Sequence, residues 1–231
     1  MATTAMCTSF KQELLSAAHC FLATQSAVTC TGSNTVFTLT GIASTANLGV
    51  GMAVTGANIP AGAVIASVDS ATQVTMSKAG TGAIASATFT ADVFKILLIK
   101  VAPTRTFDAT QTNVGTPGAG GPTATNVGTD ETSGTAYVSG GFTLTNVNPS
   151  IPSGTTATTS FSVNPSWAAA SFSTTAAIIY NSSTRLGAAA TPLSGRTCSV
   201  HDFGGTQTVT SGTFTLVMPT NDASNAILRI A

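Results

Sequence analysis

The sequence predicts a mainly β protein: an antiparallel β-sandwich or jelly-roll-like domain with one N-terminal α-helix and an inserted small all-β domain. Three observations predict this class. A long apolar run occupies residues 93–101, short β-branched runs separated by glycine and turn residues flank it, and one N-terminal segment has helical spacing of its apolar residues. The chain of 231 residues is long enough for one large or two small domains.

One segment with clear helical periodicity covers residues 3–22. Its apolar residues recur at intervals of three or four, namely Met6, Phe10, Leu14, Ala17 and Phe21. Thr3 or Thr4 can cap the start of this helix. We expect the apolar stripe to cover one face of the central strand. His19 lies close to the stripe, and we interpret it as a hydrogen-bonded histidine near the helix end rather than a metal ligand or a catalytic base.

Residues 27–90 have the pattern of a small all-β unit. Short β-branched or apolar runs recur at intervals of roughly 8–12 residues, at residues 36–39, 53–54, 64–68, 73–76 and 87–89. Residues 58–62 (NIPAG) predict a turn, because proline fixes φ and glycine supplies a positive φ, and residues 67–72 predict a hairpin loop. We predict that residues 27–90 are an insertion into a main domain formed by residues 1–26 and 91–231.

The run VFKILLIKV at residues 93–101 predicts the central strand of the core. Side chains alternate between the two faces of a strand, so this run places large apolar groups on both faces. A strand of this kind must be covered on both faces, which indicates an interior strand rather than an edge. Lys95 and Lys100 lie near its ends, where a long aliphatic stem can reach water.

Residues 102–134 are rich in proline, glycine and threonine, and Phe107 is their one aromatic side chain. A loop this long within a compact domain is usually functional or held by a partner. We therefore predict an extended arm that lies on a neighbouring subunit, with a mobile surface loop as the alternative. The candidate interface residues are Phe107, Asp108, Thr110, Val114, Pro117 and Pro122.

Strand-like runs return after residue 136, at residues 137–139, 142–146, 158–163, 171–180, 199–203, 206–209, 213–218 and 226–230. Several of them alternate apolar and polar residues, as a strand with one buried face does. The pairs Gly140-Gly141 and Gly204-Gly205 are expected at turns or bulges. We expect Trp167 to be a core anchor near the start of a strand.

Charged residues are sparse: eight are basic and eight acidic, 7% of the chain, where about a quarter is typical. No cluster of Lys and Arg is present to neutralise phosphates, so nucleic acid is not an expected partner. A monomer with so little charge lacks the repulsion that keeps proteins apart. We infer that other subunits cover much of the surface; a monomer solvated by Thr and Ser hydroxyls is the alternative.

No membrane span and no signal peptide are expected. The sequence has no window of about 18 uninterrupted apolar residues, and Lys11 and Glu13 interrupt the N-terminal segment where a signal peptide has its apolar core. We therefore expect synthesis in a cytoplasm.

The four cysteines, Cys7, Cys20, Cys30 and Cys198, form no CxxC motif and no metal-type pairing. On the predicted helix, Cys7 and Cys20 would lie about 20 Å apart, too far for a disulfide. We expect all four to be small buried hydrophobic groups. A cross-link to a neighbouring subunit is the alternative.

No active-site motif is present: the chain lacks GxSxG, HExxH, GxxxxGK and the dinucleotide fingerprint. The run GAGG at residues 118–121 is not followed by Lys-Ser/Thr, so it is not a phosphate loop. His201-Asp202 is the best acid–base candidate, but its apolar neighbours place it within a strand. Asp130-Glu131 in a loop is a weak candidate for contact with a cation. We predict no enzyme activity, no cofactor and no metal site.

A resemblance to known proteins rests on the opening MATTAMCTSFKQELLSAAH, the run FKILLIK from Phe94, and the C-terminal segments AAIIYNSSTR, VHDFGGTQTVTSGTFTLVMP and NDASNAILRIA. Together these segments resemble a family of structural proteins from tailed bacteriophages, over residues 1–22 and about 92–231. The intervening GIASTANLGVGMAVTGANIPAGAVIASVDSATQVTMS resembles a small β module that is inserted in many phage tail, fibre and capsid-associated proteins.

The resemblance implies a component of the virion, made in the host cytoplasm and then assembled into the particle. The first expectation is a head decoration (cement) protein that binds the major capsid protein and copies of itself, as a trimer, and stabilises the head. The alternative is a tail or collar component, a fibre or its adaptor, whose inserted module contacts a host-surface receptor. A third class, a carbohydrate-binding module or depolymerase, is disfavoured by the single Trp and the lack of paired carboxylates.

Overall fold

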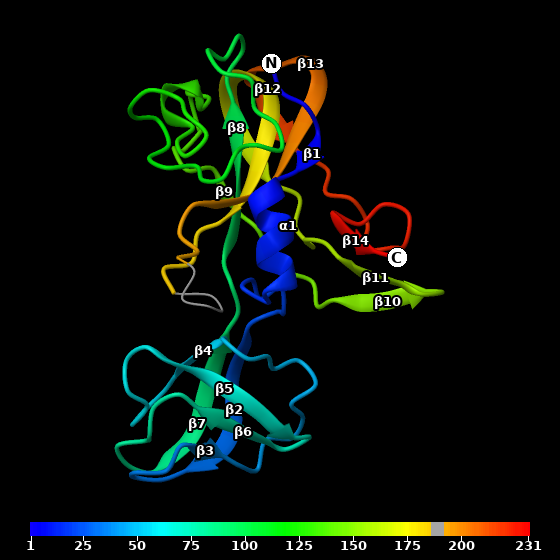
Figure 1. The fold of residues 1–231 in the computed structure, drawn as a ribbon. Coiled ribbons are helices and arrows are strands. Elements are labelled where there is room, and N and C mark those ends of the chain that lie inside the picture. The colour runs from blue at the N-terminus through cyan, green and yellow to red at the C-terminus, as the bar shows by residue number, and fades with distance from the viewer. Residues whose placement is uncertain (186–191) are drawn as a thin grey trace. The chain divides into compact units, whose positions relative to one another are not determined.

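The structure is a computed structural model that describes residues 1–185 and 192–231. The fold is mainly β and sandwich-like, with antiparallel sheets and an α-helix near the N-terminus, as the sequence predicts (Figure 1). The chain divides into two compact units. Unit 1 comprises Met1–His19, Val93–Thr145 and Phe161–Thr220, and unit 2 comprises Cys20–Asp92, Asn146–Ser160 and Asn221–Ala231.

Unit 1 is built on a five-stranded antiparallel sheet in the order β1-β13-β12-β8-β9. Its strands are β1 (Ala5–Met6), β8 (Phe94–Ile99), β9 (Phe142–Thr143), β12 (Ser166–Asn181) and β13 (Arg196–Thr215). Strand β8 pairs with β12 on one side, where Leu97 faces Ile178, and with β9 on the other. The side chains of Leu97 and Leu98, on opposite faces, are both fully buried. The prediction of an interior strand covered on both faces is confirmed.

Trp167 lies one residue after the start of β12 and is buried, as predicted. Its ring contacts four other aromatic rings at centroid distances of about 6 Å, those of Tyr137, Phe142, Phe172 and Phe214. These residues come from three strands, β9, β12 and β13, and from one loop. The cluster therefore fastens the long β12–β13 ribbon to the loop around residue 137.

Strand β13 joins segments that the sequence analysis separated. The runs predicted at 199–203 and 206–209, and the first half of the run at 213–218, belong to this one strand. Between them the register moves from Asp202 opposite Ala176 to Gln207 opposite Thr174, so four residues of β13 face one residue of β12. Gly204 lies in this bulge with φ of +72°, which confirms the expected bulge and shows why it does not end the strand.

The helix α1 (Thr8–Leu15) is much shorter than the predicted helix over residues 3–22. Residues before it form β1, where Ala5 pairs with Val200 of β13, so pairing with a neighbouring strand overrides the helical pattern. The helix ends because Ala17 has a φ of 53°. Cys7 therefore precedes the helix and Cys20 follows it. In the described part of the chain, no helix is long and apolar enough to span a membrane.

The segment 102–134, predicted as an extended arm on a neighbouring subunit, packs against its own chain instead. Phe107 is fully buried, and its backbone N–H and C=O bond to Met1 and Thr3. Val114 and Val127 are buried and joined by a backbone hydrogen bond of 2.8 Å. Phe107 and Val114 are therefore covered by residues of this chain. The segment contains one short 3₁₀ helix, η1 (Gly128–Asp130).

Unit 2 contains a six-stranded sheet formed within residues 25–90, in the order β2-β7-β4-β5-β6-β3. Its strands are β2 (Gln25–Gly32), β3 (Thr38–Leu39), β4 (Ala53–Thr55), β5 (Ala63–Ser70), β6 (Gln73–Met76) and β7 (Ile84–Thr90). Strands β5 and β6 form the predicted hairpin, with Ala71-Thr72 as its turn. Asn58 and Gly62 take positive φ in the predicted turn. Strand β2 was not predicted, because its alternating Thr, Ser and Ala residues lack large apolar groups.

The two connections to this sheet lie side by side. Cys20 O accepts a hydrogen bond from Asp92 N at 3.2 Å, and Asp92 Oδ2 accepts one from Cys20 N at 2.8 Å. Asn146 Nδ2 donates to the carbonyl oxygens of Leu22 and Asp92. Adjacent entry and exit points are what an insertion requires, and the domain boundaries at 27 and 90 stay a prediction.

Unit 2 also contains a three-stranded antiparallel sheet in the order β10-β11-β14. Its strands are β10 (Ser150–Ser153), β11 (Thr156–Thr159) and β14 (Leu228–Ile230). Strand β10 is exposed throughout and contains Pro152, a residue that sheets accept at their edges.

Candidate binding pockets around Glu131

The structure separates the six predicted interface residues. Asp108 and Thr110 bond to each other, since Asp108 Oδ1 accepts from the Thr110 hydroxyl at 2.6 Å and from its N–H at 2.8 Å. These two hydrogen bonds lower the pKa of Asp108. Pro122 is half-buried in the glycine-rich loop. Val114 and Pro117 also come together, because both line one pocket.

Asp130 holds the start of the segment 102–134 against the end of β8. Its carboxylate is fully buried and accepts hydrogen bonds from the N–H groups of Thr104 and Arg105 at 3.0 and 2.9 Å. Lys100 Nζ lies 2.9 Å from Asp130 Oδ1. Burial alone would raise the pKa of Asp130, but the two N–H donors, the Lys100 ammonium and the Thr104 hydroxyl together lower it. This carboxylate is thus neutralised within the chain.

Glu131 is also buried, and its carboxylate accepts three hydrogen bonds from the loop that follows. The Tyr137 hydroxyl donates to Oε1 at 2.8 Å, Gly140 N donates to Oε1 at 2.7 Å, and the Ser139 hydroxyl donates to Oε2 at 2.6 Å. In residues 1–185 and 192–231, no Lys, Arg or His side chain forms an ion pair with Glu131. Glu131 therefore closes the loop 131–140 with neutral donors alone.

A cavity of about 350 Å³, the Glu131 pocket, opens beside this carboxylate; it is lined by Gly118, Thr129, Glu131, Thr132, Ser133, Gly134, Tyr137 and Ser139. Glu131 and Thr132 are buried, whereas Gly118, Ser133 and Ser139 are exposed and form its rim. Burial raises the pKa of Tyr137, and the charge of Glu131 raises it further. The Tyr137 hydroxyl therefore stays neutral and acts as a donor. The lining thus combines glycine backbone, the Tyr137 ring and several hydroxyl groups with one buried carboxylate.

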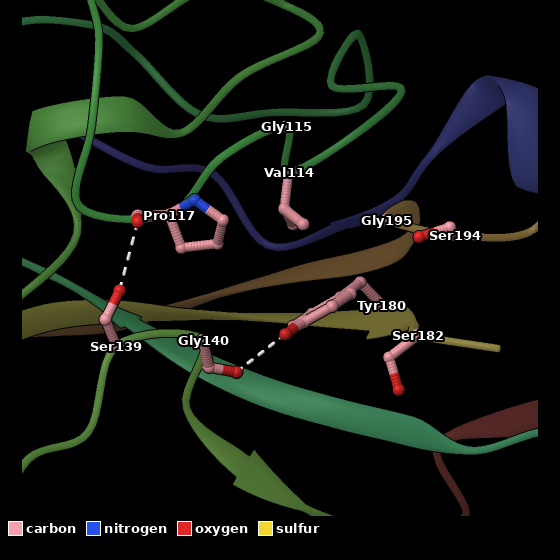
Figure 2. A pocket seen from close by; sticks show the side chains of 9 residues that line it. All are labelled: Val114, Gly115, Pro117, Ser139, Gly140, Tyr180, Ser182, Ser194 and Gly195. Carbon is pink, nitrogen blue, oxygen red and sulfur yellow. Dashed lines mark hydrogen bonds between the residues drawn. The ribbon is translucent and has the colours of Figure 1, made fainter. Parts of the chain in front are cut away.

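A second cavity of about 310 Å³, the Tyr180 pocket, is lined by Val114, Gly115, Pro117, Ser139, Gly140, Tyr180, Ser182, Ser194 and Gly195 (Figure 2). Ser139 belongs to both pockets. The Tyr180 hydroxyl donates to Gly140 O at 2.6 Å, as Figure 2 shows. Burial, followed by the charge of Glu131, raises the pKa of Tyr180 to about 12. Among the described residues, the lining of this pocket carries no charged side chain, so these residues offer hydrogen bonds and apolar contact but no acid or base.

The donors of the Tyr180 pocket are largely in use. Tyr180 donates to Gly140 O, Ser182 donates to Val93 O at 3.0 Å, and the single proton of Ser139 serves Glu131 or Pro117 O. The oxygens of these hydroxyls still accept hydrogen bonds. The side chains of this pocket therefore present mainly acceptors, which suits a ligand that donates.

Two other polar groups singled out in the sequence have structural roles. The His19 side chain is fully buried, and its Nε2 lies 2.7 Å from Glu13 Oε2 while its Nδ1 lies 3.0 Å from Asn181 Nδ2. The expectation of a hydrogen-bonded histidine is confirmed. His201 lies within β13 with Nε2 2.8 Å from Ser199 Oγ, and burial lowers its pKa. Its neighbour Asp202 points to the other face of the strand, so the two form no dyad.

The sequence analysis named Asp130 and Glu131 as a weak cation candidate but did not foresee their burial. The signal for it was composition: two of only eight acidic residues are adjacent, in a segment next to the GAGG run. Three of their hydrogen-bond partners, Thr104, Tyr137 and Gly140, lie between 6 and 26 residues away, and no sequence pattern links them. Within the described residues, no group of three or more His, Cys, Asp or Glu side chains is placed to hold a metal ion. No family model, no curated protein and no solved structure matches the chain.

Proposed function

We propose that this chain is a structural protein of a tailed-bacteriophage virion, and specifically a decoration protein that binds the major capsid protein and stabilises the head. The observation that carries the proposal is a nearly uncharged surface that exposes large apolar side chains at strand positions. Ile151 on β10 and Ile230 on β14, the outer strands of one sheet, are 66% and 61% exposed. Exposed apolar groups on a surface this poor in charge favour contact with protein neighbours.

The resemblance of residues 1–22 and about 92–231 to phage structural proteins supports the same proposal. It is also the reason for proposing a phage particle as the assembly. Neither pocket carries a pair of side chains arranged for proton transfer, and a role in assembly needs none. What assembly does need is apolar area with hydrogen-bonding groups around it. Ile151 has this setting, because Ser150 and Ser153 of the same strand are exposed beside it.

The number of copies per particle tests the proposal. Quantitative mass spectrometry of purified virions should give copies on the order of hundreds, because a decoration protein follows the repeated symmetry of the capsid. About six to twelve copies would instead indicate a component of the tail or collar.

A binding assay sharpens the test. Heads that lack the protein should bind it when it is added, and the variant Ile151→Ser/Ile230→Ser should bind at least about tenfold more weakly, since burying two isoleucines contributes several kcal/mol. Val68→Ser, which changes an exposed valine of the six-stranded sheet, serves as the control. Equal binding by all three proteins would contradict the proposed contact surface.

A tail or collar component that contacts a host-surface receptor is the second candidate, and one observation favours it. Phe37 is 48% exposed just before β3, and Val36 and Val68 are also exposed on the sheet of residues 25–90. A receptor-binding role would concentrate the effect of substitutions there. Phe37→Ser would then abolish adsorption to host cells and leave occupancy of the capsid unchanged.

A further inference from the structure

We propose that the Glu131 pocket receives an arginine side chain presented by a protein neighbour. The inference rests on the proposed function only for the identity of that neighbour, another virion protein. The chemistry of the pocket itself is argued from the charge, the hydrogen bonds and the space around Glu131.

The charge around the pocket is unbalanced. Lys100 pairs with Asp130 at 2.9 Å, which leaves Glu131 as a buried carboxylate held by neutral donors only. An ionised carboxylate is costly to bury unless hydrogen bonds or a cation compensate it. The three hydrogen bonds to Glu131 compensate in part, and a cation in the adjoining cavity would add charge-assisted bonds that neutral donors cannot supply.

The hydrogen bonds leave room for one more donor. A carboxylate has about four acceptor positions, and Glu131 uses two on Oε1 and one on Oε2. The remaining position is on Oε2, beneath Gly118. A Cβ atom on Gly118 would lie 3.5 Å from Oε2 and 3.0 Å from Ser139 Oγ. The missing side chain of Gly118 thus keeps space open directly above the vacant acceptor.

Guanidinium suits this site better than ammonium. The lining combines one carboxylate with the oxygens of Thr129, Ser133 and Ser139 and with the ring of Tyr137. Arginine presents five N–H donors in a plane and stacks on aromatic rings, whereas lysine is a compact point charge. A planar guanidinium can donate one hydrogen bond to Glu131 Oε2 and a second one to a hydroxyl oxygen at the rim.

The test is a titration of the full-length protein, followed by ¹⁵N–¹H NMR. The probes are N-acetyl-arginine amide and N-acetyl-citrulline amide, which have the same length and differ in charge, and N-acetyl-lysine amide. Probe concentrations up to about 50 mM are needed, because a single amino-acid side chain is expected to bind with a Kd on the order of millimolar. The arginine probe should shift the amide signals of Gly118, Ser133, Gly134 and Ser139 saturably.

The citrulline probe should bind at least about tenfold more weakly than the arginine probe, the loss expected for one charge-assisted bond. Equal shifts with citrulline, or no saturable shift with arginine, would overturn the inference. Equal affinity for the lysine probe would overturn the choice of arginine. Because occupancy of the capsid is measured separately, a failed titration with normal occupancy rejects the pocket and leaves the proposed function intact.

Two variants locate the binding. Glu131→Gln removes the charge and should abolish the arginine shifts. Since this variant also disturbs the loop, Gly118→Ala provides a second test that fills the space and leaves the carboxylate in place. Gly120→Ala is its matched control, because Gly118 and Gly120 both have positive φ, of 76° and 75°, while a Cβ on Gly120 would face Asn126 instead. Equal arginine binding by the two alanine variants would contradict the proposed position of the ligand.

Discussion

The six-stranded sheet of residues 25–90 and the irregular segment 102–141 are ordered by different forces. The sheet encloses an apolar core in which Leu39, Met52, Ile65 and Phe89 are almost fully buried. The segment has little regular structure, and its backbone is held by the buried carboxylates of Asp130 and Glu131. Burial of apolar area stabilises the first region, and hydrogen bonds to fixed charges stabilise the second.

This difference explains why the structure of the sheet could be predicted from the sequence and that of the irregular segment could not. Apolar side chains leave a pattern in the sequence: the continuous run at residues 93–101 predicted the interior strand β8, and short apolar runs around turn residues predicted the hairpin β5–β6. A carboxylate that gathers donors from distant loops leaves no period. The segment 102–134 was therefore predicted as an arm, since it has few apolar residues. The hydrogen bonds that order it in place of apolar contacts cannot be recognised from composition.

The start of the chain shows a second limit of sequence patterns. Helical spacing over residues 3–22 is real, yet β1 and the left-handed Ala17 restrict α1 to eight residues. Pairing of Ala5 with Val200 depends on a strand almost 200 residues away. The candidate site was missed for a different reason: the donors to Glu131 lie six to nine residues away, but hydrogen bonds to a carboxylate leave no periodic pattern in the sequence.

The strongest test of the comparison removes one region completely. Deletion of residues 27–90 should leave the rest of the chain folded, because the sheet completes its core from its own residues and its two connections meet at Cys20 and Asp92. The expected result is one cooperative melting transition by circular dichroism and calorimetry. Loss of cooperative melting would contradict the insertion at 27–90.

Within the sheet, Phe89→Ala should destabilise the protein by about 3–5 kcal/mol, because it leaves a large cavity in an apolar core. Urea denaturation followed by circular dichroism measures the change. Val68→Ala, at a side chain 39% exposed, should cost less than about 1 kcal/mol. Similar losses for the two variants would mean that apolar burial does not dominate this region.

In the irregular segment, Asp130→Asn should destabilise by about 2–3 kcal/mol, because it removes the partner of Lys100 and weakens the acceptors for Thr104 and Arg105. Asp202→Asn, on the exposed part of β13, should change the free energy of unfolding by less than about 0.5 kcal/mol. Urea denaturation at neutral pH compares the two.

The pH dependence of this difference has a definite sign. The pKa of Asp130 is lower in the folded state than the value of about 3.9 for an unfolded chain. Its contribution is therefore complete above about pH 4 and is lost as the pH falls through the folded-state pKa. The gap between the wild type and Asp130→Asn should narrow below about pH 4, and a gap that widens there would exclude this role for the carboxylate.

The smallest effect is expected at Tyr180. Tyr180→Phe removes the hydroxyl that donates to Gly140 O and should destabilise by about 1 kcal/mol. The unfolding midpoint in urea should move slightly with an unchanged slope. A loss of stability as large as that of Asp130→Asn would mean that Tyr180, rather than the carboxylates, contributes most to holding the segment 102–141.

The buried thiols supply a built-in probe of these experiments. All four cysteines are buried, and burial raises the pKa of the Cys7 and Cys30 thiols, so alkylating reagents react with them only after local opening. Cys30 belongs to the six-stranded sheet and Cys7 to the start of α1. Mass spectrometry of pulse-alkylated protein would therefore give the opening rate of each region separately, without the introduction of any further cysteine.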